Sequence, residues 1–280
     1  MLSAMRIGIA LCSVVALACA ASATTARVDR FDEQRAFALL REQVELGPRP
    51  AGSDASGKLA ERLRRLLPNG RFQPVPDGLQ NVIGVVRGRN PRRTVVVGAH
   101  YDTKDIPAFV GANDGASGTA AVVELARTIK PRQLRPTIVF ILCDGEESPK
   151  GTPDSEFERY GLRGSKVAAK TYRKAETMIL LDFVGDKDLS TPREQNSSRA
   201  LWAKLRAAAK RTGNGRYYPP TATGAVLDDH IPFNRAGVPS IDLIDFDFAC
   251  WHRTCDDLSA VSPKSLDASG ETVLELLRSL

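Results

Sequence analysis

The sequence predicts an α/β layer fold in a single domain. Short apolar runs of strand type alternate with segments whose apolar residues recur at helical spacing, which is typical of a sheet covered by helices. The 280 residues are enough for a large core, and no internal repeat divides them. A hydrophobic content of 42% and a charged content of 26% are ordinary for a globular protein.

The expected elements alternate along the chain. Helices are expected over 31–46, 58–67, 116–129, 164–175, 198–210 and 265–280. Strands are expected over 79–86, 94–99, 137–143, 178–184 and 239–244. Gly47-Pro48 terminates the first helix, and Pro68-Asn69-Gly70 terminates the second. The polar stretches 148–160 and 186–197 are long for compact connections, and long loops beside strand ends usually carry specificity.

Residues 1–23 have the composition of a secretory signal. Arg6 precedes an apolar run over 7–18 that is too short to span a membrane, and Ala21-Ser22-Ala23 is a small-x-small cleavage motif. We therefore expect an exported protein, periplasmic or secreted, that is cleaved after Ala23. Lipoprotein processing at Cys19 is the alternative, but Ala16 is a poor residue three places upstream. No later segment is apolar enough to cross a membrane.

The charge distribution argues against a nucleic-acid partner. The net charge is +6, and the basic residues are scattered along the chain rather than gathered into a stripe. A nucleic-acid-binding domain usually concentrates its basic residues on one face.

Three cysteines follow residue 23, and they fall in two settings. Cys143 lies inside an apolar strand, where a buried thiol is the simplest interpretation. Cys250 and Cys255 bracket Trp251-His252, and in an oxidising compartment they could form a disulfide or remain two free thiols. Three cysteines are too few for a disulfide scaffold or a cysteine-rich zinc site.

Carboxylates gather directly after the strand 137–143. Asp144, Glu146 and Glu147 follow it within four residues, with Gly145 at the bend. Adjacent buried carboxylates repel each other unless a cation or a proton lies between them. A metal ion with a neighbouring general base would explain them, whereas a solvated turn is the alternative when this run is taken alone.

Other candidate ligands also lie beside expected strands. His100 ends the strand 94–99, and Asp102 could hold the second nitrogen of its ring. Asp114 lies in a run of small residues, 111–118, which lacks the lysine of a phosphate-binding loop and so fits a metal ligand better. Asp182 interrupts the apolar strand 178–184, where an unpaired charge would be costly.

The carboxyl ends of parallel strands meet at one crevice, so these side chains should converge. His252 follows the strand 239–244 and adds a second imidazole to the set. Histidines combined with carboxylates suit zinc. The nearby Asp242, Asp245 and Asp247 could hold calcium. We expect instead that they are half-buried acids at the strand end that face the site, or solvated acids. His230 is expected to support the site or to begin a helix.

Five ordered motifs resemble the zinc aminopeptidase and glutaminyl cyclase superfamily, peptidase family M-twenty-eight. The motifs are HYD at His100, GANDGASG at Gly111, DGEE at Asp144, LLD at Leu180 and WH at Trp251. The resemblance runs from about Arg41 to the C-terminus and is strongest to the bacterial branch that resembles glutaminyl-peptide cyclotransferases. It implies a zinc exopeptidase-like fold, with a central twisted, mostly parallel mixed β-sheet flanked by helices on both faces. It also implies that 24–280 is a zinc-dependent catalytic domain.

The resemblance implies one set of roles for an aminopeptidase. In the two-zinc aminopeptidases, the residues matching His100 and Asp182 hold one zinc ion, and those matching Glu147 and His252 hold the other. The residue matching Asp114 bridges the two ions. The residue matching Glu146 is the general base for a metal-activated water, which hydrolyses the N-terminal residue from a peptide or protein.

Glutaminyl cyclases imply different roles for the same positions. They use one zinc ion, held by residues matching Asp114, Glu147 and His252. The residue matching Glu146 moves a proton from the α-amine to the departing ammonia. Residues matching Asp182 and Asp228 assist this reaction, and the tryptophan matching Trp251 shapes the substrate pocket. The product is an N-terminal pyroglutamate.

The motifs favour the cyclase but leave the choice open. The run 228–233, the Trp251-His252 pair and the long stretch after Glu147 resemble cyclases. The run 111–118 is closer to aminopeptidases, and the long stretch lacks a tryptophan. A glutaminyl-peptide cyclotransferase is therefore the first hypothesis and a zinc aminopeptidase the alternative. A non-catalytic binding module of the same fold is a third, lesser hypothesis, because every ligand position of the family has a residue that can bind metal. The number of zinc ions, the side-chain preference for the substrate and the oligomeric state stay open.

Overall fold

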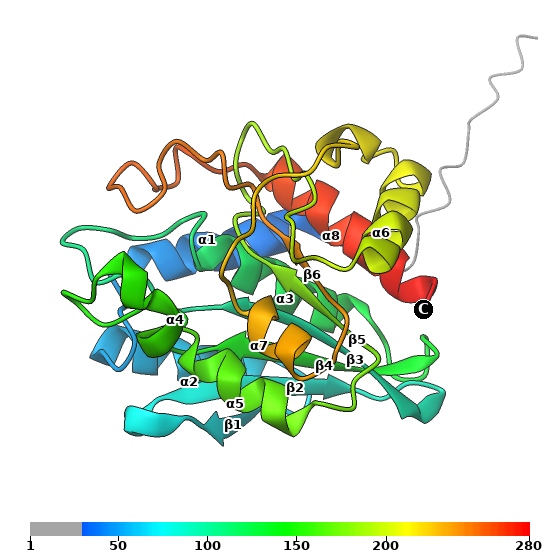
Figure 1. Ribbon diagram of the computed structural model, residues 1–280, viewed down its shortest axis with the longest axis horizontal. Coiled ribbons are helices and arrows are strands. Elements are labelled where there is room, and N and C mark those ends of the chain that lie inside the picture. Colours follow the sequence, from blue (N-terminus) through cyan, green and yellow to red (C-terminus); the bar gives the residue numbers. More distant parts are fainter. Residues whose placement is uncertain (1–29) are drawn as a thin grey trace, which may run out of the picture.

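The computed structural model describes residues 30–280, which form one α/β domain around a six-stranded sheet (Figure 1). The strand order is β1-β2-β4-β3-β5-β6. The strands are β1 (Arg71–Pro74), β2 (Gln80–Val86), β3 (Asn90–His100), β4 (Pro136–Cys143), β5 (Thr177–Leu181) and β6 (Ser240–Leu243). The expected signal peptide, the cleavage at Ala23 and Cys19 lie outside the described residues.

The sheet is mixed, and its parallel part carries the site. β3 pairs in parallel with β4 and with β5, and β5 pairs in parallel with β6. β1 and β2 join antiparallel at the other side of β4. The register aligns His100 with Cys143, so β3 and β4 end level with each other at one edge of the sheet.

Helices cover both faces, which confirms the predicted layering. The α-helices are α1 (Glu33–Glu45), α2 (Asp54–Leu66), α3 (Ala116–Thr128), α4 (Phe157–Tyr160), α5 (Arg163–Thr171), α6 (Arg199–Arg211), α7 (His230–Arg235) and α8 (Pro263–Arg278). Short 3₁₀ turns occupy Pro76–Gly78, Asp154–Glu156 and Gly215–Tyr217. Figure 1 shows α1, α6 and α8 along one side of the sheet and α5 and α7 on the other.

Alternating side chains divide the core between the two faces. Val95 and Val97 of β3 belong to the larger core, which contains apolar residues of α1, α2, α3, α6 and α8. Val96 belongs to the smaller core, with Ala168 of α5 and Phe233 of α7. This alternation is the period of two expected of a strand that is buried on both faces.

Several helix starts have local chemical reasons. The side chains of Asp32, Ser53 and Ser198 accept hydrogen bonds from backbone N–H groups in the first turns of α1, α2 and α6. Such caps satisfy N–H groups that have no partner inside the helix. These hydrogen bonds therefore help to fix where the three helices begin.

The structure differs from the expected elements in several places. It adds β1, whose four residues are partly exposed at the edge of the sheet, and α7, which has only six residues. The stretch 148–160, expected to be a loop, contains a 3₁₀ turn and α4. β3 begins at Asn90 rather than near Thr94, with an irregularity in its pairing between those residues. β1 contains one hydrophobic residue and α7 has fewer than two helical turns, so neither shows a clear hydrophobic period.

Helix α3 packs closely against the end of β5. A Cβ atom added at Gly118 would lie 2.0 Å from the backbone oxygen of Leu181. The absence of a side chain at Gly118 therefore sets the distance between the start of α3 and the residue that precedes Asp182.

We predict that Gly118→Ala destabilises the protein, because the added methyl group must push α3 away from β5. Overpacking of this kind costs about 1–3 kcal/mol of unfolding free energy, measurable by urea denaturation. The matched control is Gly57→Ala, on the exposed surface of α2 with nothing near the added atom, which should stabilise by about 0.5–1 kcal/mol. Equal stability of Gly118→Ala and the unsubstituted protein would contradict this packing argument.

Candidate active site

The carboxyl ends of β3, β4, β5 and β6 form one edge of the sheet, here named the carboxyl edge. His100 is the last residue of β3, and Asp144 to Glu147 follow β4. Asp182 follows β5 rather than interrupting it, so the expected strand over 178–184 was too long. The strand stops because the backbone N–H of Phe183 donates to Asp182 Oδ1 at 3.0 Å, and Phe183 has a φ of 46°.

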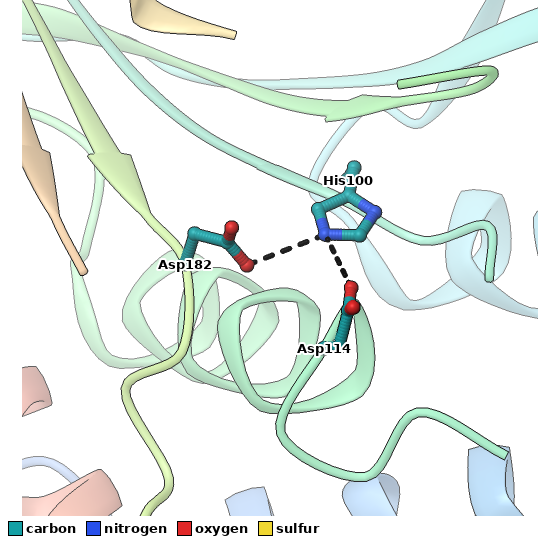
Figure 2. A group of neighbouring side chains, drawn as sticks. All are labelled: His100, Asp114 and Asp182. Atoms are coloured by element: carbon teal, nitrogen blue, oxygen red, sulfur yellow. Dashed lines mark hydrogen bonds and ion pairs between the residues drawn. The ribbon is translucent and has the colours of Figure 1, made fainter. Parts of the chain in front are cut away.

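The first candidate metal group contains His100, Asp114 and Asp182. His100 Nε2 lies 3.3 Å from Asp114 Oδ1 and 3.3 Å from Asp182 Oδ1 (Figure 2). All three side chains are buried. Burial alone would lower the pKa of His100, but the surrounding carboxylates raise it well above its usual value.

The second candidate metal group contains Asp114, Glu147 and His252. His252 Nε2 lies 3.0 Å from Glu147 Oε1 and 3.6 Å from Asp114 Oδ2. Asp114 therefore belongs to both groups. Its Oδ2 atom is buried and accepts no hydrogen bond from residues 30–280. An imidazole nitrogen and two carboxylates, one of which has a buried oxygen without a hydrogen bond, fit a zinc ion.

Asp102 contacts both His100 and the turn that carries Glu146 and Glu147. Its carboxylate accepts the backbone N–H groups of Glu146 and Glu147, each at 3.2 Å. His100 Nδ1 lies 3.1 Å from the backbone oxygen of Asp102 and 3.7 Å from its carboxylate. Asp102 thus faces that nitrogen mainly through its carbonyl group, while its side chain fixes the turn that carries the two glutamates.

The small residues before α3 allow the Asp114 loop to approach β3. Gly115 has a φ of 88°, and a Cβ atom there would lie 2.7 Å from the backbone oxygen of Asp102 and 3.2 Å from the His100 ring. Only glycine combines this backbone conformation with so close an approach. The run of small residues therefore places Asp114 directly beside His100.

A cavity of about 320 Å³ is lined by all three residues of the second group and by Asp114 and Asp182 of the first. Its polar floor includes Asp114, Glu146, Glu147, Asp182, Asp228 and His252. Its walls are largely apolar and include Phe157, Phe183, Val226, Leu227, Ile244, Phe246 and Trp251. Sites for small organic ligands commonly combine such walls with a few polar groups that fix orientation.

Glu146 and Glu147 are neighbours in the chain with opposite electrostatics. Burial, reinforced by the charge of Glu147, raises the pKa of Glu146 well above its usual value. Burial would also raise the pKa of Glu147, but hydrogen bonds from His252 and Lys104 outweigh it and lower the pKa. Glu147 is therefore a carboxylate held by cations, whereas Glu146 readily accepts a proton.

Lys104 was missed by the sequence reasoning. Its Nζ atom lies 2.9 Å from Glu147 Oε2 and donates to Ser148 Oγ at 3.2 Å. The signal was a basic residue two places after Asp102, but nothing local showed that it would reach the double glutamate.

Asp228 and Asp182 line the same cavity as Glu146. Burial and the charge of Asp182 raise the pKa of Asp228 to about 7. Burial also raises the pKa of Asp182, although the charge of His100 opposes this. Asp228 can therefore carry or release a proton near neutral pH.

Trp251 lies at the mouth of the cavity. It is 42% exposed, and its ring centroid lies 5.0 Å from that of Phe246 and 4.6 Å from that of His252. The two half-exposed rings form an apolar wall beside the candidate metal groups.

His230 lies behind the cavity rather than in its lining. It is the first residue of α7 and is fully buried. Its Nε2 lies 3.2 Å from Glu194 Oε1, and its Nδ1 lies 3.6 Å from Asp242 Oδ2.

Asp245 lies elsewhere and accepts the backbone N–H of Ser190 at 2.7 Å. A third candidate metal group contains Asp228, His230 and Asp242, whereas no such group among the described residues contains Asp245 or Asp247.

Two cysteine features border the site. Cys250 and Cys255 form a disulfide around Trp251 and His252, which decides the alternative that the sequence left open. Cys143 is a buried free thiol at the end of β4. Burial raises its pKa well above the usual value, so it stays protonated and unreactive.

The chain belongs to Peptidase family M28, whose family model matches residues 81–277. This confirms the family that the five motifs predicted. Aminopeptidase YwaD of Bacillus subtilis (strain 168) is 29% identical over 212 residues, which cover 69% of this chain and 43% of that protein. The chain spans about half the length of the curated relatives that it matches.

Solved structures match over nearly the whole described chain. A glutaminyl cyclase from an Acidobacteriales bacterium is 31% identical with a TM-score of 0.77, covering 89% of this chain and 94% of that one. A Zn-dependent exopeptidase from Parabacteroides distasonis ATCC 8503 is 29% identical with a TM-score of 0.77, covering 90% and 100%. These relatives are enzymes, and their fold confirms the predicted zinc exopeptidase-like architecture.

We predict that a chain beginning at residue 24 titrates only one thiol when it is denatured without reductant, because Cys250 and Cys255 are paired. In the native protein at pH 8, burial should keep Cys143 from reacting with an aromatic disulfide reagent. After reduction, three thiols should react. Three reactive thiols before reduction would show that the 250–255 bond is absent.

Proposed function

We propose that the protein is a zinc-dependent glutaminyl-peptide cyclotransferase, which converts an N-terminal glutamine into pyroglutamate and releases ammonia. The observation that carries this proposal is the set of three buried carboxyl side chains, Glu146, Asp182 and Asp228, in the cavity that also contains the second metal group. Hydrolysis and cyclisation both move a proton from the nucleophile to the departing nitrogen. In cyclisation the nucleophile is the substrate's own α-amine, and adjacent carboxyl side chains are suited to orient that amine.

Asp114, Glu147 and His252 are the residues that would hold the zinc ion. They are on three separate loops, but their ligand atoms lie within 4.8 Å of one another, and Asp114 Oδ2 accepts no hydrogen bond from the described residues. The bound ion would polarise the side-chain amide carbonyl of the substrate. Lys104 holds the other oxygen of Glu147 and so keeps that side chain oriented.

The chain's own residues would carry the proton transfers. The α-amine nitrogen of the substrate attacks its own side-chain amide carbon, forming one C–N bond while the bond to the departing nitrogen breaks. Glu146 takes the proton from the α-amine and gives it to that nitrogen, so ammonia leaves and no water is consumed. Asp182 and Asp228 would orient the α-amine at this position, because both line the same cavity. Positioning both reacting groups in one molecule supplies much of the rate.

The apolar wall would exclude water and hold the substrate. Trp251 and Phe246 face the mouth of the cavity, where the peptide that follows the glutamine must leave. The match to the acidobacterial glutaminyl cyclase, over most of both chains, supports this choice.

A zinc aminopeptidase is the second candidate, and one observation favours it. The group His100, Asp114 and Asp182 shares Asp114 with the zinc group proposed above, so two ions could lie side by side. Glu146 would then take a proton from water instead of from an amine. The similarity to Aminopeptidase YwaD is consistent with this alternative. A non-catalytic binding module has less support, because both groups retain ligand-type side chains.

We further propose that 24–280 is the catalytic domain of an exported protein, periplasmic or secreted. The Cys250–Cys255 disulfide supports an oxidising compartment. Helices long and apolar enough to cross a membrane do not occur within 30–280. Lipid attachment at Cys19 stays the lesser alternative to cleavage after Ala23.

We predict ammonia release from a glutamine-initiated peptide, with a product that lacks a free amino terminus. The same preparation should not cleave leucyl anilide at a comparable rate, because the proposed reaction activates no water. Ammonia and aromatic amine are measured separately on one preparation. Anilide cleavage without ammonia release would reject the cyclase and select the aminopeptidase.

We predict that Glu146→Gln lowers kcat by at least about 10²-fold, because the amide cannot take the proton. Zinc content, measured by atomic absorption, should be unchanged because Glu146 is not a proposed ligand. The control is Glu61→Gln on the surface of α2, where the side chain pairs with Arg64 and activity should be retained. An active Glu146→Gln enzyme would assign the proton transfer to another residue.

We predict that zinc raises the Tm of the metal-free protein, because an ion that binds only the native state stabilises it. At 100 times the Kd the gain is about 2.7 kcal/mol. Asp114→Asn should abolish the rise, since Asp114 belongs to both groups. Asp245→Asn, which alters an acid outside both groups, should keep it. An unchanged rise in Asp114→Asn would place the ion elsewhere.

A further inference from the structure

The loop 250–256 contains one proposed metal ligand, His252, and contacts the backbone of another, Asp114. Its disulfide, Cys250–Cys255, encloses His252 in a six-residue covalent ring. The next residue, Asp256, is fully buried, although Cys255 is exposed. The loop therefore runs from the surface, past one ligand, to a buried carboxylate.

Asp256 holds the backbone on which Asp114 lies. Its Oδ1 accepts the N–H of Asn113 at 2.7 Å, and its Oδ2 accepts the N–H of Asp114 at 3.0 Å. Its backbone oxygen accepts the N–H of Ala112 at 3.2 Å. One residue thus satisfies three successive N–H groups of the loop that carries Asp114, from 142 residues away in the sequence.

Arg49 secures the opposite side of the same loop. Its guanidinium group is fully buried and donates to the backbone oxygens of Gly111 at 3.0 Å and Tyr101 at 3.2 Å. The loop is therefore held by its N–H groups to an anion and by its carbonyl groups to a cation. Paired hydrogen bonds to charged groups are the stronger ones in proteins, and they leave Asp114 little freedom.

The covalent ring holds His252 in a conformation that an open chain would avoid. Its φ is 52°, in the left-handed region, where a residue with a Cβ atom is disfavoured. Turns inside the ring maintain it, because the N–H of Arg253 donates to the oxygen of Cys250 at 2.9 Å and that of Asp256 to the oxygen of Arg253 at 3.0 Å. Opening the ring would let this segment relax away from Glu147.

We propose that loop 250–256 is a single positioning element for the metal site. Asp256 fixes the position of Asp114, and the Cys250–Cys255 bond fixes the position of His252. Asp256 is a positioning residue, because it contacts the backbone of a ligand and not the cavity. This inference rests on the proposed function, since it assumes zinc at Asp114, Glu147 and His252. Residues that orient metal ligands from behind typically change metal affinity by 10–100-fold when they are replaced.

The test measures the affinity of the full chain for zinc alone, by competition with a chromophoric chelator. Asp256→Asn loses one acceptor, and the double variant Cys250→Ser/Cys255→Ser opens the ring at the surface. Each should raise the Kd for zinc by at least about tenfold. The visible absorption bands of bound Co²⁺ should also shift, which a general loss of stability would not cause. Asp257→Asn is the matched control, because Asp257 is half-exposed and caps only Ser259, and its Kd should stay within about twofold.

The outcomes separate this inference from the proposed function. If the unsubstituted protein binds zinc and both variants bind it equally well, the positioning role is wrong and the zinc site stands. If the unsubstituted protein binds no zinc, the proposed function fails and this inference fails with it. If Asp256→Asn does not fold by circular dichroism, the double serine variant decides, because its changed atoms lie near the surface.

Discussion

Buried negative charge at the carboxyl edge is the constraint on which the rest of this structure depends. The carboxylates that share this burial are Asp102, Asp114, Asp144, Glu146, Glu147, Asp182, Asp228 and Asp256. A buried carboxylate without a partner costs several kcal/mol, and like charges nearby raise the cost further. A divalent cation bound at Asp114 would relieve much of that cost. In this account, metal binding and folding stability are therefore linked.

The acids divide by what their oxygen atoms contact. Asp102 and Asp256 each accept two backbone N–H groups, and Asp144 accepts one from Gln80, so these carboxylates hold loops in place. Asp114 Oδ2 and Asp228 Oδ2 accept no hydrogen bond from the described residues and belong to side chains that line the cavity. Within the first set, Asp256 holds the backbone at Asp114, which belongs to the second. The unpartnered oxygens are then available to a metal ion or a substrate.

Much of the fold could be predicted because hydrophobic period is a local property. Runs such as 137–143 and 94–99 alternate in the chain with helical segments, and the structure has a strand at each. β1 was missed because its four residues include one hydrophobic side chain, and α7 was missed because six residues are fewer than two helical turns. The convergence of His100, Asp114, Glu147 and His252 followed from ordered motifs beside strand ends. Asp256 could not be found this way, because its partners are 142 and 143 residues distant and the chain around it resembles any polar loop.

The central claim is that Asp114, Glu147 and His252 converge to bind zinc at the carboxyl edge. Anomalous X-ray diffraction at the zinc absorption edge, on crystals of the zinc-loaded protein, tests it most directly because the signal locates the ion itself. The account predicts a peak within coordinating distance of these three side chains, as the single-zinc cyclase requires. A second peak between His100 and Asp182 would favour the aminopeptidase. No peak at Asp114, Glu147 and His252 would contradict the account.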